Sequence, residues 1–78
     1  MHSTDNKIYY FSVNLTYDEC MAYYKGHYTQ VQVLSDSGET IRFAAEKLRP
    51  FISSLGVRGR FRLKLAPQHK FISLEKIS

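Results

Sequence analysis

Residues Val57–Leu65 alternate between uncharged and basic side chains, and this pattern constrains the fold more than any other feature of the chain. Successive side chains of a β-strand point to opposite faces, so a period of two predicts a strand. The uncharged face would carry Val57, Gly59, Phe61, Leu63 and Leu65. The opposite face would carry Arg58, Arg60, Arg62 and Lys64. The fold therefore needs a sheet that buries one face of this strand and exposes the other to water.

A capping box marks the start of one clear helix. The Thr16 hydroxyl can accept the amide proton of Glu19, and the Glu19 carboxylate can reach back to the Thr16 amide. Lys25 suits the last turn of a helix, and Gly26 suits the left-handed position that follows it. These signals predict a helix over Tyr17–Lys25. Its apolar stripe at helical spacing would be Tyr17, Cys20, Met21 and Tyr24.

Four further segments show strand patterns, and turn residues separate them. They are Ile8–Val13, Tyr28–Leu34, Glu39–Ala44 and Lys70–Ile77. Ser35–Gly38 has turn chemistry, so the second and third of these segments should form a β-hairpin. In the last segment, Ile72 and Leu74 should share one face, with Phe71 and Ile77 on the other.

Two connections complete the chain. Ala45–Leu48 is compatible with a helical turn, but Pro50 interrupts any continuous helix. Pro50 instead suits the first position of a short helix over Pro50–Leu55, which Gly56 would close. Ala66–His69 is a predicted turn.

These elements predict an α+β fold in the order β-α-β-β-α-β-β. About five mostly antiparallel strands would form a curled sheet, with the one main helix over an open face or end. Closure into a small, partly open barrel remains an alternative, because it would remove exposed strand edges. The length of 78 residues fits one domain, 1–78, with a flexible segment over residues 1–6.

The composition argues against several classes of protein. One cysteine cannot form an internal disulfide, and the polar N-terminus lacks the apolar stretch of a secretion signal, so we expect a cytoplasmic location. No apolar run is long enough for a membrane span. Cys20, His27 and His69 lack paired metal-ligand spacing, and no carboxylate pair or phosphate-binding loop appears. We therefore expect no enzyme, no metal and no cofactor.

Positive charge is concentrated in the second half of the chain. Residues 1–39 carry two cations and five carboxylates, a net −3, whereas residues 40–78 carry nine cations and two carboxylates, a net +7. The predicted basic strand would align four cations over roughly 20 Å, a geometry that can follow a nucleic-acid backbone. The alternative is a solvated face whose charges discourage aggregation. The candidate anion-binding residues are Arg58, Arg60, Arg62 and Lys64, with Arg42 and Arg49 as extensions.

Tyrosines form a second set of candidates. The chain has six tyrosines and no tryptophan, and exposed tyrosine rings can stack on bases or form protein interfaces. In the alternative interpretation, their rings cover the edges of a small core and only the hydroxyls reach water. The candidates for stacking or an interface are Tyr9, Tyr10, Tyr23 and Tyr28.

Several short motifs also resemble those of a known group of sequences. The motifs are Tyr9-Tyr10-Phe11-Ser12, Leu48-Arg49-Pro50-Phe51, Gly56-Val57-Arg58-Gly59-Arg60-Phe61-Arg62-Leu63 and Lys70-Phe71-Ile72-Ser73-Leu74-Glu75. With them, the chain resembles a family of short bacterial proteins known only as a domain of unknown function. The resemblance implies a stand-alone bacterial cytoplasmic domain, and it supplies no activity, ligand or catalytic residue.

Two functions are consistent with these features. The first is a small binding module whose basic strand engages an anionic partner, either nucleic acid or an acidic protein. The second is a protein-interaction or homo-oligomerising domain, because a small domain with open strands has reason to pair. Membrane binding is not expected.

Overall fold

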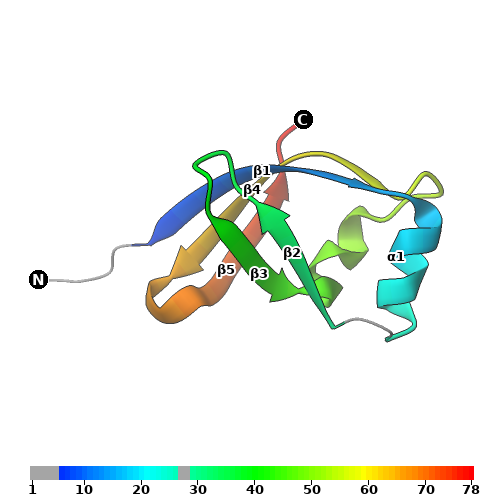
Figure 1. Ribbon diagram of the computed structural model, residues 1–78, viewed down its shortest axis with the longest axis horizontal. Helices are drawn as coiled ribbons and strands as arrows, with labels where there is room; N and C mark the ends of the chain where they lie inside the picture. The colour runs from blue at the N-terminus through cyan, green and yellow to red at the C-terminus, as the bar shows by residue number, and fades with distance from the viewer. Residues whose placement is uncertain (1–5, 27–28) are drawn as a thin grey trace, which may run out of the picture.

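The structure is a computed structural model that describes residues 6–26 and 29–78, and it has an α+β fold built from two antiparallel sheets (Figure 1). The larger sheet has the strand order β1-β4-β5, and β2 and β3 form a separate hairpin. The strands are β1 (Lys7–Leu15), β2 (Gln30–Leu34), β3 (Thr40–Ala44), β4 (Val57–Ala66) and β5 (Lys70–Lys76). The helices are α1 (Tyr17–Tyr24) and two 3-10 segments, η1 (Ala45–Phe51) and η2 (Pro67–His69).

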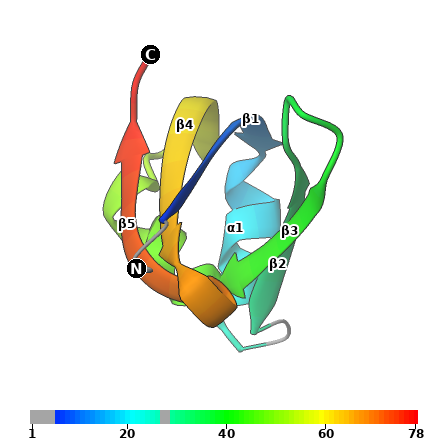
Figure 2. The same ribbon diagram turned by 90° about the vertical axis from the view of Figure 1, so that its left-hand side faces the viewer.

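The α+β class and the five mostly antiparallel strands are confirmed, but the strands do not form one curled sheet. Over residues 6–26 and 29–78 they form two sheets, and no barrel closes. Figure 2 shows the larger sheet and the hairpin on opposite sides of the molecule, with α1 between them at one end. The predicted flexible segment, residues 1–6, lies almost wholly outside the described residues, as does the predicted start of β2 at Tyr28.

The core fills the space between the two sheets. β1 pairs with β4 along its whole length, with Phe11 opposite Phe61, and both side chains are buried. The hairpin contributes Val31, Ile41 and Phe43 from the other side. As the alternation predicts, β4 buries Val57, Phe61, Leu63 and Leu65 and turns its four cations away from the core.

The capping box at the start of α1 is confirmed. The Thr16 amide donates to Glu19 Oε1 at 2.8 Å, and the Glu19 amide donates to the Thr16 hydroxyl at 3.1 Å. The helix ends at Tyr24, one residue earlier than predicted. Its apolar stripe is only partly buried, because Cys20 is in the core while Tyr17 and Tyr24 are exposed.

The predicted short helix over Pro50–Leu55 is wrong. The helical turn comes earlier, as the 3-10 segment η1, and Pro50 lies inside it. Ala45 and Leu48 are buried, so their packing against the core outweighs the tendency of Pro50 to start a helix. The chain then makes a tight turn closed by two hydrogen bonds of 2.9 Å between Ser53 and Gly56.

The predicted faces of β5 are also wrong. Lys64 pairs with Ser73 but Leu65 pairs with Phe71, so Ile72 is an extra residue in a β-bulge. The bulge places Phe71 on the core side with Leu74, which lies opposite Leu63. A bulge shifts the alternation by one residue, and nothing in the local pattern of β5 indicates it.

The turn between β4 and β5 contains backbone strain. Gln68 and His69 both have positive φ, at 67° and 60°, a conformation that costs a residue with a side chain roughly 1–2 kcal/mol. Gln68→Gly should therefore stabilise the domain by about 0.5–1 kcal/mol, after the entropy cost of glycine is subtracted. Urea denaturation measures this gain. Lys70→Gly is the control: its φ is −78°, so it should destabilise instead.

Candidate functional site

The candidate site is the side of the β1-β4-β5 sheet that points away from the core, which we call the outer face. Its cations are Arg58, Arg60, Arg62 and Lys64 of β4, which we call the basic row. Each of them lies opposite an outward residue of β1. The β4–β5 pairing adds Ser73 and Glu75 on the other side of the row. The outer face consists of Ile8, Tyr10, Ser12, Asn14, Arg58, Arg60, Arg62, Lys64, Ser73 and Glu75.

Arg60 is held by the carboxylate of Asp36, which lies in the turn between β2 and β3. Its Nη1 donates to Asp36 Oδ1 at 2.9 Å and to the Ser12 hydroxyl at 3.1 Å, and its Nη2 donates to Asp36 Oδ2. The hydrogen bonds from Arg60 lower the pKa of the Asp36 carboxyl. The Asp36 amide also donates to the Tyr10 carbonyl at 2.8 Å, so the β2–β3 turn docks on the edge of β1.

Arg62 is held within its own sheet. Its Nη2 lies 2.5 Å from Glu75 Oε1, directly across the β4–β5 pairing. The Glu75 carboxylate raises the pKa of the Arg62 guanidinium, and the nearby Tyr10 side chain adds a smaller effect in the same direction. Arg62 therefore has a fixed position in the middle of the outer face, beside Tyr10.

Arg58 and Lys64 form no salt bridge with the part of the chain that the structure describes. They lie at the two ends of the row, six residues apart, which is about 20 Å along a strand. The face thus has four cations, and Asp36 and Glu75 offset two of them. Its excess charge of +2 is at the ends of the row.

The structure does not place Arg42 and Arg49 in this row. Arg42 points outward from β3 in the other sheet, where its Nε donates to Gln32 Oε1 at 3.0 Å. Arg49 is on η1, with its guanidinium 4.9 Å from the centre of the Tyr24 ring. Sequence reasoning grouped both with the basic row because all six cations lie in the positively charged second half of the chain, but Arg42 belongs to β3 and Arg49 to η1, not to β4.

The four candidate tyrosines have different surroundings. Tyr9 is only 6% exposed and belongs to the core, so its ring is not available for stacking. Tyr10 is 41% exposed on the outer face. Tyr23 packs against the core, and Tyr28 lies outside the described residues. Of the three candidate tyrosines that the structure describes, only Tyr10 therefore lies beside the basic row.

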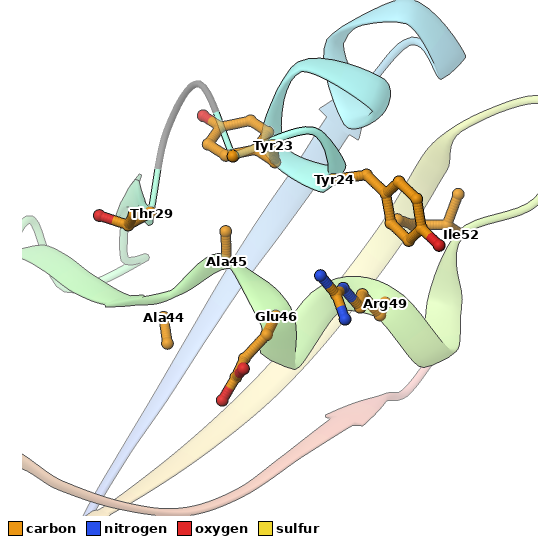
Figure 3. Close-up of a pocket in the computed structure, with 9 residues that line it drawn as sticks. Tyr23, Tyr24, Thr29, Ala44, Ala45, Glu46, Arg49 and Ile52 are labelled. Carbon is orange, nitrogen blue, oxygen red and sulfur yellow. The ribbon is translucent and has the colours of Figure 1, made fainter.

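A separate cleft of about 370 Å³ lies between α1 and η1 (Figure 3). Its lining includes Tyr24, Arg49, Glu46 and Ile52, and Figure 3 shows the Arg49 side chain beside the Tyr24 ring. The C-terminal end of α1 and the Glu46 carboxylate both disfavour an anion here. Among the described residues that line this cleft, no nucleophile has a base beside it.

Other reactive groups are not arranged as an active site. Burial raises the pKa of the Cys20 thiol, which keeps it protonated and unreactive. Residues 6–26 and 29–78 contain no group of three side chains that could hold a metal ion. Within the same residues, no helix has the length and apolar character to cross a membrane.

Sequence reasoning did not predict two partners of the basic row, Asp36 and Glu75. It explained Asp36 by its turn alone and gave Glu75 no role, because docking of the β2–β3 turn on β1 brings Asp36 to Arg60, and the β4–β5 pairing brings Glu75 to Arg62.

A family model described as "Protein of unknown function (DUF2835)" matches residues 7–77. The chain belongs to the DUF2835 family. No curated protein and no solved structure matches this DUF2835 chain. The family match covers β1 to β5, and so it includes the entire outer face.

Proposed function

We propose that this DUF2835 domain is a non-catalytic binding module whose outer face engages nucleic acid. The observation that supports this most is the position of Arg58 and Lys64 at the two ends of the outward side of β4, with no carboxylate partner in the described chain. Between them, Arg60 and Arg62 are held in fixed positions. A straight row of donors about 20 Å long fits a linear polyanion.

The geometry favours nucleic acid over a second copy of the chain on this face. Two copies that met through their outer faces would bring four unpaired cations together, and like charges across an interface are unfavourable. An acidic protein would satisfy the charge, but it does not need donors in a straight line. Nucleic acid fits both the charge and the line.

The double variant Arg58→Glu/Lys64→Glu should weaken binding at least about tenfold, because it reverses both unpaired cations. Fluorescence anisotropy with labelled oligonucleotides of about 16 nucleotides measures this loss. With two phosphates neutralised, log K for the wild type should fall with log salt at a slope of about −1.4 to −1.8. Binding would then weaken about tenfold between 50 and 200 mM salt.

The matched control is Lys25→Glu/Arg42→Glu, which changes the net charge equally away from the outer face. It should bind like the wild type apart from a small loss of long-range attraction. Equal losses in the two double variants would mean that only the total charge matters, which contradicts a site on the outer face. If no oligonucleotide binds the wild type at about 50 mM salt, an acidic protein partner replaces nucleic acid.

A further inference from the structure

Two apolar side chains are exposed on the outer face, next to the cations. Tyr10 is 41% exposed and Ile8 is 45% exposed, and they are adjacent outward residues of β1. In the β1–β4 register, Tyr10 lies opposite Arg62 and Ile8 lies opposite Lys64. The apolar surface therefore lies alongside the half of the row that ends at Lys64.

Charge alone gives this face little affinity. Asp36 and Glu75 are bonded to Arg60 and Arg62, so only two cations have no carboxylate partner. Duplex DNA presents mainly phosphates to a flat surface, and two phosphate contacts supply only weak attraction. A ligand that also used Tyr10 and Ile8 would gain stacking and apolar contact.

We infer that the ligand is single-stranded nucleic acid, with one base stacked on Tyr10 and flanking phosphates near Arg58 and Lys64. This inference rests on the proposed function of the outer face. A base in a duplex has both faces covered by its neighbours, whereas a single strand offers a free face to an aromatic ring. Arg62 lies directly opposite Tyr10 in the β1–β4 register and is bonded to Glu75, so its guanidinium is held on the same face as that ring, where it can stack on the next base.

Tyr10→Ala should weaken binding of a single strand at least about fivefold and leave binding of the matching duplex unchanged. Tyr10→Phe keeps the ring without its hydroxyl, and it should bind within about twofold of the wild type. Tyr17→Ala is the matched control, because Tyr17 is 45% exposed on α1, away from the outer face. Both tyrosines are exposed in the wild type, so circular dichroism should report three folded variants.

Stacking can also be observed directly, because the chain has no tryptophan. Tyr10→Trp creates a single indole on the outer face, and its fluorescence should be quenched by a single-stranded oligonucleotide but not by the duplex. Tyr17→Trp should show no quenching with either.

The outcomes separate this inference from the proposed function. If Arg58→Glu/Lys64→Glu abolishes binding but single strand and duplex bind equally and Tyr10→Ala has no effect, the stacking inference is overturned while the proposed function stands. Equal losses in Tyr10→Phe and Tyr10→Ala would assign the effect to the hydroxyl, which also overturns stacking. If neither oligonucleotide binds, the proposed function itself fails.

Discussion

Gly56→Ala is expected to destabilise the domain by roughly 3–5 kcal/mol. Gly56 has a φ of 92°, and a Cβ atom there would lie 2.0 Å from the Leu15 carbonyl oxygen and 2.9 Å from the Tyr17 amide nitrogen. These are backbone atoms of the junction between β1 and α1, so no side chain can move aside. The backbone would have to shift where the capping box holds α1 in place. A chain of this length has a total stability of roughly 4–12 kcal/mol, so this loss is a large fraction of the total.

Gly38→Ala isolates the steric part of this effect. Gly38 has the same φ of 92°, but a Cβ atom there would meet nothing within 4 Å. Its loss should be about 1 kcal/mol, the cost of the left-handed backbone alone. Urea denaturation followed by circular dichroism gives both values. Similar losses for the two variants would mean that the close approach of Gly56 to the β1–α1 junction is not tight in solution.

Phe61→Ala is expected to cost about 3–5 kcal/mol, because it opens a cavity at the centre of the core. Phe61 is 0% exposed on the central strand β4. Its ring lies nearly parallel to that of Phe11, with centroids 6.1 Å apart, and meets the Phe51 ring edge-on at 5.1 Å. Its loss therefore removes contacts with both β1 and η1. A decrease in the urea midpoint with an unchanged slope would report this loss of stability.

Phe71→Ala is the comparison for Phe61→Ala, since the same ring is removed from an edge strand. Phe71 is 37% exposed, and its ring lies 4.6 Å from Lys47 Nζ. Partial exposure and one cation–π contact predict a cost of about 1 kcal/mol. A cost as large as that of Phe61→Ala would mean that β5 is more deeply packed than its exposure indicates.

The features that sequence reasoning predicted well are those set by neighbouring residues. The capping box needs only Thr16 and Glu19. The alternation of β4 needs only that one face of the strand packs against the core and the other faces solvent. The hairpin follows from turn residues at Ser35–Gly38 between two alternating segments. In each case the interaction that fixes the structure is contained in a few consecutive residues.

The features that it missed depend on distant parts of the chain. Burial of Leu48 against the core sets η1, whatever the local preference of Pro50. Pairing with β4 imposes the bulge at Ile72. The separation into two sheets depends on which strands pair, and alternation alone does not specify that.

The candidate site shows the same division. Alternation placed Arg58, Arg60, Arg62 and Lys64 on one exposed face, as the structure confirms. The carboxylates that bind Arg60 and Arg62 belong to Asp36 and Glu75, which are 24 and 13 residues away in the chain. Sequence reasoning therefore could not predict that they reduce the net charge of the face. The exposure of Tyr10 and the burial of Tyr9 likewise required knowledge of which face of β1 meets the core.

The pairing of β1 with β4 has a consequence for how the chain acquires its structure. Leu15 pairs with Val57 and Lys7 pairs with Leu65. β1 therefore cannot form its hydrogen bonds until residues more than forty positions later have been synthesised. Such non-local pairing favours slow folding, in milliseconds to seconds, because loop closure precedes any stabilising contact. Until β4 has been made by the ribosome, the edge of β1 that pairs with it has no hydrogen-bonding partner, and such an unpaired strand edge is a target for chaperones or aggregation.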